Sequence, residues 1–175
     1  MNVEQREAAL ELLERQLGIA WGLLDYHLER LVDDDLHWAP VDNRWSIRRM
    51  GDSWVPDWAD VEPTPLPVPT AAWVTWHIGW WWSTALTHLT GDPVPSRDDV
   101  RWPGGAESTR NWLRSLHSEW RTALAEADDL AEISRFPWPA DLGYTVADMC
   151  AWANVELMKN AAELGQLTMI RNADG

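Results

Sequence analysis

Helical spacing gathers two carboxylates, an amide and an ammonium in one short segment near the C-terminus. Steps of four and three residues from Met149 pass through Glu156, Asn160 and Glu163 before apolar side chains resume. At about 100° per residue, Asn160 falls near the centre of the apolar arc, and the two glutamates lie about 20° apart on its flank. The sequence therefore predicts a polar patch that faces the protein interior or its edge.

A histidine in an upstream apolar segment could complete this patch. His77 lies within TAAWVTWHIGWWW. Three tryptophans share its predicted helix face: Trp73, Trp76 and Trp80. Carboxylates from one helix and an imidazole from another are typical of metal sites that leave a position open for water. Two structural interpretations stay open beside this one: His77 as a core histidine bonded to a carbonyl group, and Lys159 in a surface ion-pair ladder with both glutamates.

Other reactive side chains form no comparable pattern. His88 lies eleven residues after His77, about 16 Å along a helix, which is too far for one metal ion. His117 stands beside an apolar stripe and is predicted to be a core side chain. Cys150, the single cysteine, falls on the apolar arc, which favours a buried inert thiol.

Four amphipathic helices must position these residues. They are expected over residues 3–31, 71–89, 109–127 and 146–170. The residues suited to cap their N-termini are Asn2, Thr70, Ser108 and Thr145. No alternating run is long enough to predict a sheet. The predicted fold is all-α: an up-down four-helix bundle with long loops after helices one and three, in a single domain over residues 1–175.

The segment 32–70 is too rich in Pro, Asp and Gly for a regular helix. Its tryptophans are expected to pin it over the end of the bundle: Trp38, Trp45, Trp54 and Trp58. A loop of this length is more often functional than not.

Composition limits the partners and the compartment. A formal charge of −14 disfavours nucleic acid and anionic membrane surfaces. No apolar run reaches the ~18 residues of a membrane span, and a single cysteine with no basic, apolar leader favours a cytoplasmic protein. The 15 tryptophans, against 2 tyrosines and 1 phenylalanine, indicate either a ligand cavity or an interface, which allows a homodimer.

The layout resembles the DinB-like superfamily of four-helix-bundle proteins. The resemblance covers WSIRR, TAAWVTWHIGWWW and NVELMKNAAELGQL, where the family usually has His-x-x-x-His followed closely by Gly-Gln. It implies a metal triad at His77, Lys159 and Glu163. His77 and Glu163 suit a divalent ion, zinc or nickel, but an ammonium does not ligate metal.

Two hypotheses follow from this departure. In the first, the site shifts by one helical turn, and His77 and Glu163 hold the metal together with Asn160 or Glu156. In the second, no metal is bound, because the Lys159 ammonium replaces its charge and pairs with the glutamates.

Three functions remain open. The resemblance implies a metal-dependent hydrolase or a transferase that uses a low-molecular-weight thiol, with Glu156 and Lys159 as catalytic candidates and Trp76 and Trp80 as cofactor-binding candidates. The alternatives are a metal-free bundle that binds a small molecule, and a dimeric interaction protein whose tryptophans form the interface.

Overall fold

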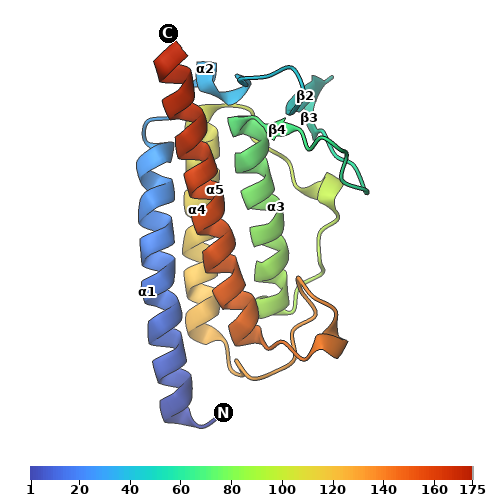
Figure 1. Cartoon of the computed structure of the whole chain (residues 1–175). Helices are drawn as coiled ribbons and strands as arrows, with labels where there is room; N and C mark the ends of the chain where they lie inside the picture. The colour runs from blue at the N-terminus through green and yellow to red at the C-terminus, as the bar shows by residue number, and fades with distance from the viewer. Residues whose placement is uncertain (175) are drawn as a thin grey trace.

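Four long helices form most of the chain in the computed structural model, which describes residues 1–174 (Figure 1). They are α1 (Val3–Leu28), α3 (Ala71–Thr90), α4 (Ala106–Glu126) and α5 (Val146–Asp174). Helices α1 and α3 each pack against both α4 and α5. The four helices therefore enclose one shared core, and the all-α prediction is confirmed in this coarse form.

The helices do not alternate in direction along the chain. Trp82 and Trp120, from the second halves of α3 and α4, lie with their ring centroids 6.4 Å apart. The indole of Trp102, just before α4, donates a hydrogen bond to Thr75 near the start of α3. These contacts show that α3 and α4 run parallel, while α1 and α5 run the opposite way (Figure 1).

The predicted up-down order is therefore wrong at the connection between α3 and α4. A parallel pair needs a segment that returns along the bundle, and residues 91–105, which include η1 (Arg97–Asp99), provide it. About 15 extended residues reach roughly 50 Å, which exceeds the roughly 30 Å length of a 20-residue helix. Periodicity defines the faces of helices but not their directions. The long connections predicted after the first and third long helices are present.

The segment between α1 and α3 contains short elements that the sequence did not predict. They are α2 (Asp33–Leu36), β1 (Arg44–Trp45), β2 (Ile47–Met50), β3 (Ser53–Pro56) and β4 (Val68–Pro69). β1 pairs with β4 in parallel, and β2 pairs with β3 in antiparallel register around Gly51, which has a φ of 62°. Strands of two or four residues are too short for alternation to reveal them.

Helix caps explain where the long helices begin. The predicted N-caps are correct for three of them: Asn2, Thr70 and Thr145. The fourth, Ser108, is wrong, because α4 already begins at Ala106. The backbone N–H of Ala106 donates to the carboxylate of Asp33 at 2.7 Å. This carboxylate comes from a distant segment, so local spacing could not have revealed it.

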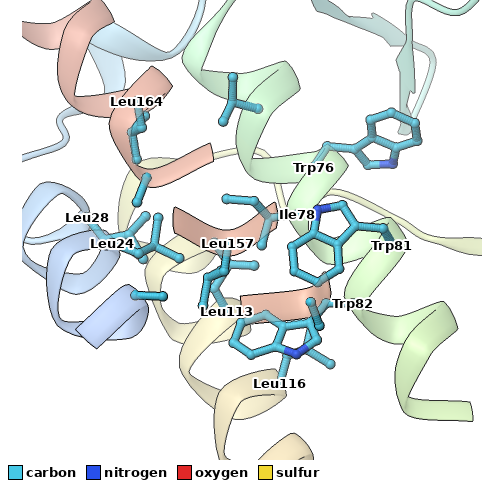
Figure 2. Packing of buried hydrophobic residues seen from close by; sticks show 14 of the residues in the cluster. Leu24, Leu28, Trp76, Ile78, Trp81, Trp82, Leu113, Leu116, Leu157 and Leu164 are labelled. Carbon is cyan, nitrogen blue, oxygen red and sulfur yellow. The ribbon is translucent and has the colours of Figure 1, made fainter. Parts of the chain in front are cut away.

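Leucines of α1, α4 and α5 pack against tryptophans of α3 in the core (Figure 2). Trp81 and Trp82 are almost fully buried and face neighbouring helices within the chain. A methyl group on Gly79 would come within 1.7 Å of the Trp112 ring, and one on Gly165 within 2.4 Å of the His27 ring. These two glycines allow aromatic rings to approach the backbones of α3 and α5 closely.

No helix in the described part of the chain is long and apolar enough to cross a membrane.

Candidate functional site

A cavity of about 420 Å³ lies between α3, α5 and the segment 45–69, and we call it the indole cavity. Three indoles line it: Trp45, Trp58 and Trp73. Its polar lining includes His77 from α3 and Lys159, Asn160 and Glu163 from α5. The antiparallel packing of α3 on α5 thus brings His77 together with Lys159, Asn160 and Glu163, but not with Glu156, the other glutamate of the predicted patch.

His77 is held as a neutral imidazole at the edge of this cavity. Its ring stacks on Trp73, with centroids 4.8 Å apart and an interplanar angle of 13°. Burial, the largest cause, and the Lys159 ammonium lower the pKa of His77 to about 4, against an opposing contribution from the Asn160 side chain. Its Nδ1 atom is buried without a hydrogen-bond partner in the described residues. The core-histidine interpretation requires a hydrogen bond from a ring nitrogen to a carbonyl group, and Nδ1 forms no such bond within residues 1–174.

Asn160 uses both ends of its amide within the protein. Its oxygen accepts a hydrogen bond from the Trp81 indole at 3.0 Å, and its nitrogen donates to Glu163 at 2.8 Å. The side chain is almost fully buried. Asn160 therefore positions the Glu163 carboxylate, and its oxygen is already committed to an indole N–H.

Lys159 forms an ion pair with Glu156 one turn earlier on α5. The Glu156 side chain is 16% exposed and the Lys159 side chain 50% exposed, and Glu156 is not part of the cavity lining. Within residues 1–174, no ion pair joins Lys159 to Glu163. One of the two predicted ion pairs is therefore present. Lys159 lines the cavity, and Glu156 partly compensates its charge.

These residues do not fit a metal site with three protein ligands. Lys159, which stands at a ligand position of the family motif, is an ion-paired ammonium, and the Asn160 oxygen is occupied. Among residues 1–174, no three His, Cys, Asp or Glu side chains gather closely enough to hold a metal ion. His77 and Glu163 remain as donors, one fewer than the three protein ligands of typical catalytic zinc sites.

Trp76 and Trp80, the predicted cofactor-binding pair, do not line the indole cavity. The Trp76 indole donates to the Val100 carbonyl at 3.1 Å, and Trp80 packs edge to face on Trp58. Trp45 and Trp58 line the cavity instead, although the sequence suggested only that they pin the loop. The unusual length of the segment 32–70 was the one signal that pointed to them.

Comparison with known families identifies the superfamily of the chain. The model of the DinB superfamily matches residues 16–164, a range that includes His77, Lys159 and Glu163. The chain belongs to the DinB superfamily. A search of curated proteins finds no significant match. The family assignment predicted from the motifs is therefore confirmed, and the activity has to be argued from the site.

Proposed function

We propose that the indole cavity of this DinB superfamily protein binds a small organic molecule without a metal ion. The Lys159 ammonium would then supply the positive charge that a metal supplies elsewhere. The main support is a cavity of about 420 Å³ with indole walls and with polar side chains of His77, Lys159 and Glu163 in its lining. Ligand sites typically combine apolar walls, a volume of roughly 300–1,000 Å³ and a few polar groups that fix orientation.

The lining residues divide this task between them. The indoles of Trp45, Trp58 and Trp73 offer apolar area to the body of a ligand. The neutral imidazole of His77 lines the cavity and offers a polar group that can orient a ligand. Glu163 is held in place by Asn160, so a second polar contact is oriented before the ligand arrives.

Ligand binding is tested by thermal unfolding and calorimetry with a set of small aromatic molecules. Ala59→Leu is the test variant, because Ala59 lines the cavity and a larger side chain reduces its volume. Val61→Leu is the control, because Val61 lies in the same loop, is 83% exposed and does not line the cavity. We expect ligands to raise the Tm of the wild type and of the control but not of Ala59→Leu. Absence of any Tm shift in the wild type overturns the proposal.

The second candidate is a metal-dependent hydrolase or a transferase that uses a low-molecular-weight thiol. It is favoured by the His77 imidazole and the Glu163 carboxylate, which line the same cavity. Protein purified without a nickel column would then carry stoichiometric zinc or nickel, and His77→Ala would lose it. Metal-free wild type excludes this candidate, and with it the catalytic roles of Glu156 and Lys159 in metal chemistry.

Assembly and compartment are further parts of the proposal. Ile19 of α1 and Val155 of α5 are each 67% exposed and line one shallow depression, a surface that could pair two copies. Sedimentation as a monomer at micromolar concentration would exclude the homodimer. A cytoplasmic site of action suits the lone Cys150 thiol, and cell fractionation tests it.

A further inference from the structure

The charges around the indole cavity are unequal in sign. Three lining carboxylates belong to Asp60, Glu62 and Glu163. In the described part of the chain, Lys159 is the one cationic side chain of the lining, and Glu156 already pairs with it. His77 adds no positive charge at neutral pH, since its pKa is about 4. The lining therefore carries three carboxylates against one ammonium, and its net formal charge is negative.

The indole faces add to this preference for positive charge. An indole ring carries negative potential over its faces, so it attracts cations positioned there. The rings of Trp45, Trp58 and Trp73 lie nearly parallel, at 11° to 24° to one another, with centroid separations of 5.1 to 6.5 Å. His77 stacks on Trp73. The indole N–H of Trp73, the positive edge of that ring, is turned to the carbonyl of Asp57 at 2.8 Å.

One cation of the chain already uses this combination of groups. The guanidinium of Arg97 lies 4.8 Å from the centroid of the Trp58 ring. The same side chain approaches the Asp60 carboxylate to 3.9 Å. Arg97 is not part of the cavity lining, so it shows the preference of this cluster without filling the cavity.

We propose that the indole cavity selects an organic cation, a protonated amine or a quaternary ammonium with an apolar body, over anions and neutral molecules of the same shape. Asp60 and Glu62 lie on exposed loop positions, where they attract the cation to the cavity. Inside, the indole faces and the Glu163 carboxylate contact its charged end. This inference rests on the proposed binding function and adds the class of ligand.

Calorimetry on the full chain at pH 7 tests the inference with four probes that share a phenyl group. Phenethylamine is a protonated amine, benzyltrimethylammonium a quaternary cation, 3-phenylpropionate an anion and 2-phenylethanol neutral. We expect both cations to bind about tenfold more tightly than the anion or the alcohol, because the indole faces and carboxylates act together.

A pair of charge variants tests whether the carboxylate inside the cavity contributes. Glu163→Gln should weaken the binding of both cations several-fold and that of 2-phenylethanol less, because the amide keeps a hydrogen-bonding oxygen but loses the charge. Glu7→Gln removes the same charge from an exposed position on α1 and should alter neither. If both variants weaken cation binding equally, the effect comes from net charge, and the inference is wrong.

The outcomes separate this inference from the proposed function. If the anion or the alcohol binds as tightly as the cations, the cation preference is wrong while small-molecule binding stands. If the anion binds most tightly, Lys159 and not the carboxylates determines the ligand class. If none of the four probes binds at millimolar concentration, both the inference and the proposed function fail.

Discussion

Two histidines stack on tryptophans at opposite seams of the bundle. His77 lies on Trp73 where α3 meets α5, and His117 lies on Trp21 where α4 meets α1, with ring centroids 4.0 Å apart and an interplanar angle of 2°. The His117 pair borders a groove of about 410 Å³, close in size to the indole cavity. Burial lowers the pKa of each histidine to about 4. By these measures the two seams are alike.

Their polar surroundings differ. The Nδ1 atom of His77 is buried and unpartnered within the described residues, whereas neither ring nitrogen of His117 is. Burial is the largest cause of the lowered pKa of His117; the charge of Arg121 lowers this pKa as well, and that of Asp25 raises it. The lining of the groove also includes Glu14. A lowered pKa and a neighbouring hollow are therefore not enough to mark a site. A buried unpartnered atom is not enough either, because among the same residues Nε1 of Trp82 is also unpartnered and the Trp82 ring lies 6.1 Å from that of His117. The linings separate the two regions: three indoles line the indole cavity, whereas in the described residues Trp21 is the one indole that lines the groove.

The largest expected effect is on the pH dependence of stability at His77. Its folded-state pKa of about 4 lies below the usual histidine value of 6.5. Between these values the unfolded chain takes up a proton that the folded chain does not, so falling pH destabilises the fold. The loss of unfolding free energy over this interval is on the order of 3 kcal/mol. His77→Phe should remove it, as measured by urea unfolding at pH 7 and pH 4.5.

His117→Phe provides the matched comparison at the other seam. The pKa of His117 also lies at about 4, but its ring borders an open groove, where solvent screens the interaction. The loss of unfolding free energy between pH 7 and pH 4.5 should therefore be reduced less by His117→Phe than by His77→Phe. Equal recovery in both variants would show that the two seams are equally buried in solution.

The second largest effect is a gain of metal affinity at one seam. Lys159→His replaces the ammonium with an imidazole at the family's ligand position, beside His77 and Glu163. We expect zinc affinity to rise at least about a hundredfold, or about 2.7 kcal/mol. Competition with a zinc-binding dye measures it. The double variant with His77→Ala should lose the gain, and zinc binding by the wild type with equal affinity would contradict the role given to Lys159.

Much of the site could be predicted because helical periodicity reports which side chains share a face. Helical spacing placed three polar residues of α5 on neighbouring positions: Lys159, Asn160 and Glu163. It placed His77 on the tryptophan face of α3, and antiparallel packing of the two helices brings these faces together. The family motif then fixed the register. The start of α5 at Val146 was predicted from a different local signal, the capping-box spacing of Thr145 and Asp148.

The missed features depend on contacts between distant segments. Trp45 and Trp58 line the cavity because β1 pairs with β4 and the loop folds over α3. The parallel course of α3 and α4 depends on residues 91–105, whose path no periodicity describes. The sequence placed Asn160 as a polar residue on the apolar arc of its helix. It did not indicate that the Trp81 indole would donate a hydrogen bond to the Asn160 oxygen.

A third, smaller effect concerns the stack at the His117 groove. Trp21→Leu removes an aromatic pair, which should cost about 1 kcal/mol of unfolding free energy. It also exposes His117, so the pKa of that imidazole should rise towards its usual value. Chemical denaturation and NMR titration measure the two effects. Ligand binding in the indole cavity should not change, and a loss of binding would show that the two seams are coupled.

The smallest effects come from the cations beside the two rings. Lys159 is the second cause of the lowered pKa of His77, and Arg121 is the second cause for His117. Lys159→Met and Arg121→Met should each raise the pKa of the adjacent histidine, and both values should stay below 6.5 because burial remains the larger cause. NMR titration of the imidazole resonances measures both shifts. The shift at His77 should be the larger, since charges interact more strongly where less water screens them. A larger shift at His117 would mean that water reaches the indole cavity more freely than the groove.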